Sequence, residues 1–206
     1  MGGNIPYVQK FALRKLAGAL PVALAAAVFS PFAMVPAASA QAVHLTVCHG
    51  FACTYRTQLP WTASDRKTIA GYFRGARTPQ AERRAISRAV QHFERRSTQV
   101  IGVRDAPKSD AKQNGRVGQM DCVDESTNTQ TLLRHLAGEG LLKHHAVRSR
   151  ASRGFLLDGR YFHWTAVVRD PKGTDWAIDS WYEPAGGPPD IMPLEEWKKR
   201  GVRGER

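Results

Sequence analysis

The sequence predicts an α+β fold, in which helices precede a set of antiparallel strands. Two observations support this class. Between residues 78 and 137, apolar side chains recur at helical spacing behind recognisable helix starts. After Leu142, short runs of β-branched and aromatic residues alternate with turn residues. Because helices and strands are segregated along the chain, the pattern is typical of α+β folds rather than of a parallel α/β sheet.

The first 40 residues have the order of a secretory signal peptide. Three basic residues and no acidic ones accompany an apolar stretch, Leu16 to Phe29, and the small-residue cleavage motif Ala38-Ser39-Ala40 follows. The apolar stretch contains a proline and is shorter than the roughly 20 residues that a membrane span needs. We therefore expect cleavage after Ala40, a periplasmic or secreted product without a transmembrane segment, and a single domain over residues 41–206.

The N-terminal half of this domain is expected to be mainly helical. Residues 43–48 alternate like a strand, and Ser64-Asp65 is expected to cap a helix that runs to Phe73. Thr78-Pro79 combines an N-cap with proline at the first helical position. The helix that follows has one apolar face, which indicates a core-packing element: Ala81, Ala85, Ile86, Ala89, Val90 and Phe93. Polar residues 104–119 predict a loop.

The next helix carries the first candidate for chemistry. Asp121 is a suitable N-cap, and glycines at 138 and 140 are expected to end the helix after about Ala137. Cys122 falls in the first turn, where free N–H groups and the helix dipole stabilise an anion and can lower a thiol pKa. Acidic residues at 121, 124 and 125 oppose a thiolate unless a cation lies close by. Cys122 shares a helical face with Leu133 and Leu136, so we expect it to face the sheet.

Strands are expected at residues 145–149, 154–157, 161–168 and 176–181, and a short helix at 194–200 follows the break at 186–189. Residues 169–173 have the composition of a turn. If this turn is centred on Pro171, His163 lies directly opposite Asp179 on the same face of the hairpin. A carboxylate on the neighbouring strand can hold the tautomer of an imidazole and stabilise its protonated form.

Cys122, His163 and Asp179 thus offer a nucleophile, a base and a carboxylate that orients the base. Each residue alone has an ordinary structural explanation, since a buried cysteine often acts as a small hydrophobic residue. Their order, a cysteine at a helix start followed by histidine and aspartate on adjacent strands, favours a catalytic triad.

The other two cysteines are expected to pair with each other. Four residues separate Cys48 from Cys53, and cysteines this close tend to form a disulfide in an oxidising compartment. A metal site from these cysteines with His44 and His49 is the alternative, although a second cysteine pair is lacking. Pairing leaves Cys122 as a free thiol, which in an exported protein calls for an explanation.

Three segments carry a family resemblance: residues 118–125 (Gly-Gln-Met-Asp-Cys-Val-Asp-Glu), 163–168 (His-Trp-Thr-Ala-Val-Val) and 178–181 (Ile-Asp-Ser-Trp). They resemble the Cys, His and Asp motifs of the bacterial transglutaminase-like cysteine proteinases, and the layout is similar to that of an uncharacterised group of exported proteobacterial proteins. The resemblance spans residues 118–182. It implies a papain-like core, with the cysteine helix packed on an antiparallel sheet and additional N-terminal helices in this chain. It also makes Gln119 a candidate oxyanion donor, beside the backbone N–H of Cys122.

The sequence therefore predicts a thiol-dependent acyl-transfer enzyme that hydrolyses or transamidates an amide bond without a metal or other cofactor. Peptides or proteins, including those of the cell envelope, are the expected substrates. The alternatives are an inactive exported domain of the same fold that binds a protein partner or an anionic envelope polymer, and a redox role for Cys122. The net charge of +12, or +9 without residues 1–40, suits anionic polymers. No nucleic-acid-binding pattern is present, so no nucleic acid partner is expected.

Overall fold

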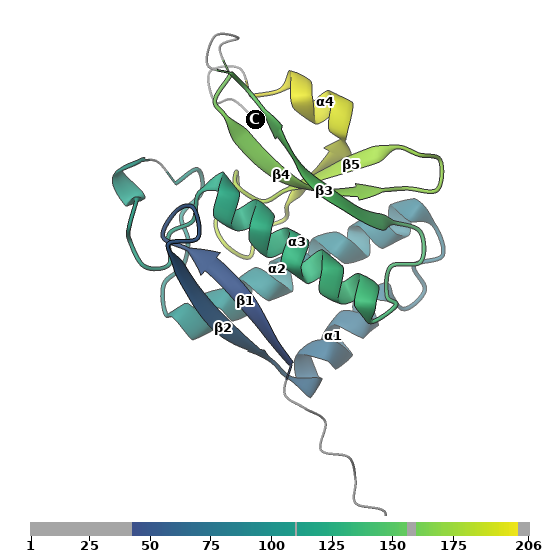
Figure 1. Cartoon of the computed structure of the whole chain (residues 1–206). Helices are drawn as coiled ribbons and strands as arrows, with labels where there is room; N and C mark the ends of the chain where they lie inside the picture. Colours follow the sequence, from purple (N-terminus) through teal and green to yellow (C-terminus); the bar gives the residue numbers. More distant parts are fainter. Residues whose placement is uncertain (1–42, 110, 156–159, 202–206) are drawn as a thin grey trace, which may run out of the picture. The chain divides into compact units, whose positions relative to one another are not determined.

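The computed structural model describes residues 43–109, 111–155 and 160–201. The signal peptide expected at residues 1–40 lies outside the described residues. Those that are described belong to one compact unit and form a two-stranded hairpin, four α-helices and a four-stranded antiparallel sheet (Figure 1). The mixture of helices and antiparallel strands confirms the α+β class. Among the described helices, none has the length and apolar character that a membrane crossing requires.

The chain opens with a hairpin of β1 (Val43–His49) and β2 (Tyr55–Trp61), of which only β1 was expected. Pro60 lies within β2 and argues against a strand there, since proline cannot donate to a ladder. In a two-stranded hairpin every strand is an edge, so Pro60 is tolerated opposite His44. The buried side chains of the hairpin, Leu45, Val47, Leu59 and Trp61, contribute to the core.

Two helices follow, as the sequence predicts. Helix α1 (Ala63–Phe73) begins one residue before the expected Ser64, because Thr62 and Asp65 form a reciprocal capping box. Helix α2 (Pro79–Ile101) has Thr78 as its N-cap, whose side chain accepts a hydrogen bond from the Ala81 N–H. The loop at 104–119 contains a short 3-10 turn, Ala111–Gln113.

Helix α3 (Cys122–Gly138) has Asp121 as its N-cap, with the Asp121 carboxylate accepting from the Asp124 N–H at 2.8 Å. The sheet then follows in the order β3 (Ala146–Arg153), β4 (His163–Arg169), β5 (Asp175–Asp179) and β6 (Asp190–Pro193), and α4 (Leu194–Lys199) closes the described part. Strand β6 was not expected. The strand expected at 154–157 is not formed by residues 154 and 155, and the rest of it lies outside the described residues.

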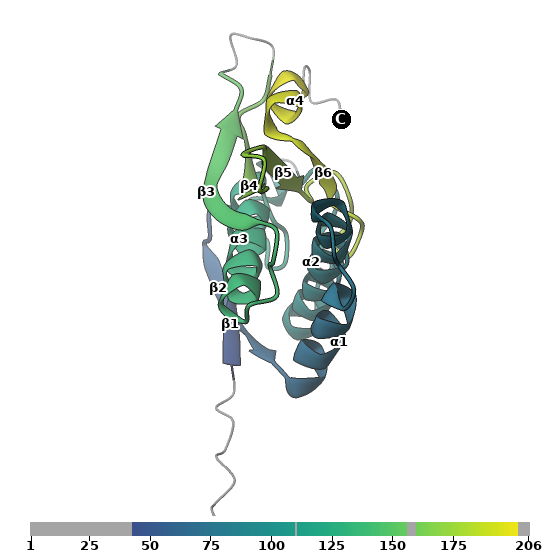
Figure 2. The same ribbon diagram turned by 90° about the vertical axis from the view of Figure 1, so that its right-hand side faces the viewer.

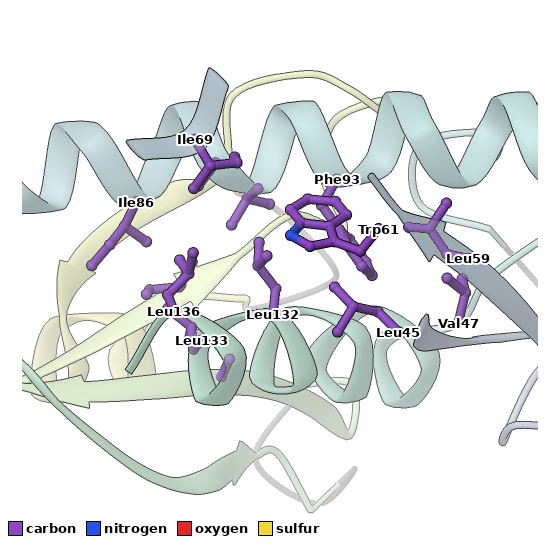
Figure 3. Close-up of a cluster of buried hydrophobic side chains, with 14 of the residues drawn as sticks. Leu45, Val47, Leu59, Trp61, Ile69, Ile86, Phe93, Leu132, Leu133 and Leu136 are labelled. Carbon is purple, nitrogen blue, oxygen red and sulfur yellow. The ribbon is translucent and has the colours of Figure 1, made fainter. Parts of the chain in front are cut away.

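Helices α2 and α3 face each other across the main hydrophobic core (Figures 1 and 2). Figure 3 shows their side chains meeting those of the hairpin, with Trp61 packed beside Phe93 and Leu132. The apolar face expected for α2 is buried except for the half-buried Ala81, and Leu133 and Leu136 of α3 are buried as well. This core anchors the helix that carries Cys122.

The two faces of the sheet have different coverings. Ala166, Val168 and Ile178 point into the main core beneath α2 and α3. The neighbouring residues Val167 and Ala177 point the other way and pack against Leu194 and Trp197 of α4. Because side chains alternate along a strand, every residue of β4 and β5 can be assigned to one of these two faces.

Hydrogen bonds to Glu82 link α2 to the connection between α3 and β3. Its fully buried carboxylate accepts hydrogen bonds from the backbone N–H groups of Lys143, His144 and His145 and from the His145 ring, at 2.7–3.1 Å. Burial alone would raise the pKa of Glu82, but the His145 ring and these N–H groups hold the pKa below its usual value. The carboxylate therefore contributes to stability in its charged form.

Candidate active site

A cavity of about 670 Å³ lies at the end of the sheet where β4 begins. Cys122 and His163 both line this cavity, although 40 residues separate them in the sequence. Its other walls come from the loop after β1, the loop before α3, the first turn of α3, the end of β3 and the segments before β4, after β5 and after α4: Phe51, Lys108, Ser109, Asn114, Asp121, Val123, Arg153, Tyr161, Phe162, Trp181, Tyr182 and Gly201.

Cys122 is the first residue of α3 and is the free, half-buried cysteine of the described chain. Its thiol points toward the carbonyl oxygen of Phe162, with the sulfur 4.0 Å away. Burial raises the pKa of the thiol to about 11, and the charges of Asp121 and Asp179 add to this effect, while the Trp164 N–H opposes it. The lowered pKa that the helix position suggested is therefore wrong, because burial outweighs the helix N-terminus.

The two acidic residues that follow Cys122, Asp124 and Glu125, do not behave as ordinary carboxylates. Burial raises the pKa of Asp124 to about 6, and that of Glu125 rises well above its usual value through burial and the nearby Asp105. A raised pKa means that Glu125 carries less negative charge at a given pH than an ordinary glutamate. Its repulsion of a Cys122 thiolate is therefore weaker than its place in the sequence suggests.

His163 and Asp179 form the hydrogen-bonded pair that the sequence predicts. The Nε2–H of His163 donates to the Asp179 carboxylate at 2.7 Å, and both side chains are buried. A carboxylate acceptor fixes the proton on Nε2 in the neutral imidazole, which leaves the lone pair on Nδ1. Within the described chain Nδ1 has no hydrogen-bond partner, so it is available to accept a proton.

The pairing register differs from the expected one. Val168 lies opposite Trp176 and Ala166 opposite Ile178, which centres the turn on Lys172 and not on Pro171. Asp170 stabilises this turn, because its carboxylate accepts from the N–H groups of Lys172 and Thr174. His163 is therefore a diagonal neighbour of Asp179 and not directly opposite. A shift of two positions preserves the face, so the pair still meets.

The sequence predicts that the helix packs its Cys122, Leu133 and Leu136 face on the sheet face that carries His163, and this prediction is wrong. By alternation His163 and Asp179 share the face of Val167 and Ala177, which α4 covers, whereas α3 packs on the opposite face. Cys122 reaches the same cavity as His163 because it is the first residue of α3 and lies beside the start of β4. The candidate site thus spans the end of the sheet.

Aromatic rings surround the His163–Asp179 pair. The His163 ring centroid lies 4.8 Å from that of Trp181, 5.7 Å from that of Trp197 and 6.0 Å from that of Tyr182. The indole N–H of Trp197 donates to the same Asp179 oxygen as His163, at 2.7 Å. Sequence reasoning missed Trp197, because the contact depends on how α4 packs on the sheet.

Cys48 and Cys53 form the predicted disulfide. The loop that it closes has positive φ at four successive residues, 50–53, an arrangement that costs about 1–2 kcal/mol for each residue other than glycine. Its N–H groups hold the start of α3: those of Phe51 and Cys53 donate to Asp124 at 2.8 and 2.6 Å, and that of Ala52 donates to Asp121 at 3.2 Å. The disulfide loop is thus a clasp on the helix of Cys122.

The alternative metal site is not formed by these residues. Cys48, Cys53 and Asp124 are close enough to share an ion, but the two sulfurs are joined to each other. Both ring nitrogens of His49 are engaged, one with Thr57 and the other with the Gly118 N–H.

Replacing Cys48 and Cys53 by serine together is expected to lower the free energy of unfolding by about 2 kcal/mol, since the unfolded chain loses its short closed loop. Urea unfolding measures this change, with Cys122→Ser as the control that leaves the clasp intact. Peptide mapping without reduction should show the 48–53 link and a free Cys122. An unchanged unfolding midpoint, or a link to Cys122, would contradict the clasp.

The candidate oxyanion donor Gln119 is engaged elsewhere. Its side chain is buried, donates to the Arg104 carbonyl at 3.1 Å and accepts from the Ala106 N–H at 3.3 Å. It does not line the cavity. This placement favours the backbone N–H of Cys122 as the oxyanion donor.

Comparisons with protein-family models, with curated proteins and with solved structures found no match to this chain.

Proposed function

We propose that this chain is a thiol-dependent acyl-transfer enzyme in which Cys122 is the nucleophile, His163 the general base and acid, and Asp179 the residue that orients His163. The observation that carries the proposal is the buried His163–Asp179 hydrogen bond, which leaves Nδ1 of His163 unpartnered, together with the shared position of His163 and the free Cys122 on one cavity wall. Such a base held by a third group is the general arrangement of activated nucleophiles.

The raised pKa of Cys122 determines how the thiol would react. At neutral pH the thiol is protonated, so its proton must move to Nδ1 of His163 as the sulfur attacks the carbonyl carbon of an amide. The Cys122 N–H would stabilise the oxyanion of the tetrahedral intermediate. Collapse of the intermediate gives a thioester, and His163 returns the proton to the leaving amine. Water or a second amine then releases the acyl group.

We also propose that the fold is the papain-like core of the transglutaminase-like proteinases and that the protein works outside the cytoplasm. The order of the three residues and the packing of α3 on an antiparallel sheet support the first proposal. The disulfide supports the second, because such links persist in oxidising compartments. Peptides or proteins are the proposed substrates.

A burst experiment with p-nitrophenyl acetate, an activated ester that needs no specific recognition, tests the acyl-enzyme. We expect about one p-nitrophenolate per protein in the first turnover and an acetyl group on Cys122 in the mass spectrum. Cys122→Ala should abolish both, whereas the Cys48→Ser/Cys53→Ser variant should keep a detectable burst. Acetylation confined to lysines would count against the enzyme.

One observation favours the second candidate, an inactive binding domain of the same fold. A thiol with a pKa of about 11 has little thiolate at neutral pH, as is usual for a buried structural cysteine. The burst experiment separates the two candidates, because the inactive domain would show no acylation of Cys122.

A further inference from the structure

Two positively charged side chains line the cavity beside Cys122 and His163, and the triad uses neither. Arg153 is the last residue of β3 and is only 6% exposed. Its guanidinium lies 4.2 Å from the Trp197 ring, donates to the Tyr182 hydroxyl at 2.8 Å and also donates to the Trp197 carbonyl. All of these partners are uncharged.

The charge of Arg153 lacks a counterion within the described chain. No carboxylate of the described residues lies within ion-pair distance of it, and its Nε–H has no hydrogen-bond partner. Asp179, the nearby buried carboxylate, already accepts from His163 and Trp197. A buried cation without a partner is strongly unfavourable, so such a residue is expected to meet an anion from outside the chain.

Lys108 adds a second positive charge to the same cavity. It is exposed, and its backbone is held in the left-handed region with φ of 53° by the N–H hydrogen bond to the Trp181 carbonyl at 2.8 Å. Its ammonium lies 5.3 Å from the Tyr182 ring, whose hydroxyl is the partner of Arg153. Tyr182 thus lies between the two cations, and Asp121 is the acidic residue on the cavity wall.

We propose that the cavity selects peptides that carry a carboxylate beside the amide bond to be cleaved, with Lys108 and Arg153 as the specificity-determining residues. The inference rests on the proposed function, since the bond in question is the one that Cys122 attacks. A planar guanidinium matches the two oxygens of a carboxylate, and the exposed ammonium attracts the same group as it enters.

Two thiol reagents of nearly equal size, iodoacetate and iodoacetamide, test this charge preference directly at Cys122. Because the reagents differ in charge, the ratio of their alkylation rates reports the field at the sulfur. His163 also affects the ratio, so the comparison is made between variants that keep His163. Peptide-level mass spectrometry follows Cys122 in the unreduced protein.

Lys108→Gln is expected to lower the iodoacetate-to-iodoacetamide rate ratio about three- to tenfold, and added salt should shrink the difference. Lys172→Gln, which removes the same charge from the exposed β4–β5 turn, should leave the ratio unchanged. Arg153→Lys keeps the positive charge but loses the planar guanidinium. We expect this variant to lower the iodoacetate-to-iodoacetamide rate ratio less than Arg153→Gln does. An unchanged ratio in both Lys108→Gln and Arg153→Gln would overturn the proposal.

The outcome is separable from that of the proposed function, which the neutral ester p-nitrophenyl acetate tests. A normal burst without any charge preference would overturn the selectivity and leave the enzyme standing. A charge preference that depends on Lys108 without a burst would support the anion-binding cavity and defeat the enzyme.

Discussion

Replacing His163 by alanine is expected to slow the acylation of Cys122 by p-nitrophenyl acetate about 10²- to 10⁴-fold at neutral pH. The reason is that the Cys122 thiol, with its pKa raised to about 11, is protonated there and needs an acceptor for its proton. His163 lines the same cavity, and its Nδ1 is the ring nitrogen that Asp179 does not engage. Stopped-flow measurement of the burst gives the rate.

The pH profile distinguishes loss of a base from a loss of structure. Without His163, only the thiolate reacts, so the rate should rise about tenfold per pH unit up to the thiol pKa of about 11. The unmodified protein should show a much shallower dependence on pH, because His163 accepts the proton of the thiol. His144→Ala is the matched control, since that ring lies outside the cavity. Equal burst rates in His163→Ala and the unmodified protein would remove His163 from the mechanism.

Replacing Glu82 by glutamine is expected to lower the free energy of unfolding by about 3–5 kcal/mol. The Glu82 carboxylate is fully buried and receives three backbone N–H groups and the His145 ring. Glutamine offers one oxygen and adds an NH₂ group that faces donors, so several buried N–H groups lose their acceptor. Urea unfolding measures the loss, with the exposed Glu139→Gln at the end of α3 as the control.

The same variant should change how stability depends on pH. The pKa of Glu82 is lower in the folded protein than in the unfolded chain, so its contribution is fully present above the unfolded value, about 4.3. The contribution is lost as the pH falls through the folded pKa. The difference in stability between the unmodified protein and Glu82→Gln should therefore shrink in acid. A difference that stays constant to pH 3 would show that Glu82 acts by packing alone.

The features that the sequence predicts correctly are mostly local. Thr78 and Asp121 cap their helices because a cap needs only its own side chain and the next few N–H groups. The Cys48–Cys53 disulfide follows from close spacing. The His163–Asp179 contact was also predicted, and it survives the error in register because the true shift is an even number of residues.

The features that the sequence does not predict depend on packing between distant segments. Strand β6 exists because it pairs with β5, and its four residues carry little pattern of their own. Trp197 reaches Asp179 only when α4 covers the sheet. The direction of the Cys122 pKa shift is not predicted, because the burial that raises the pKa depends on tertiary packing, in which the thiol lies beside the distant Phe162.

The hydrogen bond from Trp197 to Asp179 also bears on the order in which the chain folds. Proteins are synthesised from the N-terminus, and Trp197 follows all three residues of the proposed triad. A growing chain thus presents Cys122, its clasp and even His163 before the indole that helps to hold Asp179 has been added. For the proposed enzyme, the hydrogen bonds that hold His163 and Asp179 are complete only after α4 has packed on the sheet. A partly synthesised chain therefore carries the Cys122 thiol without the complete triad that would acylate it.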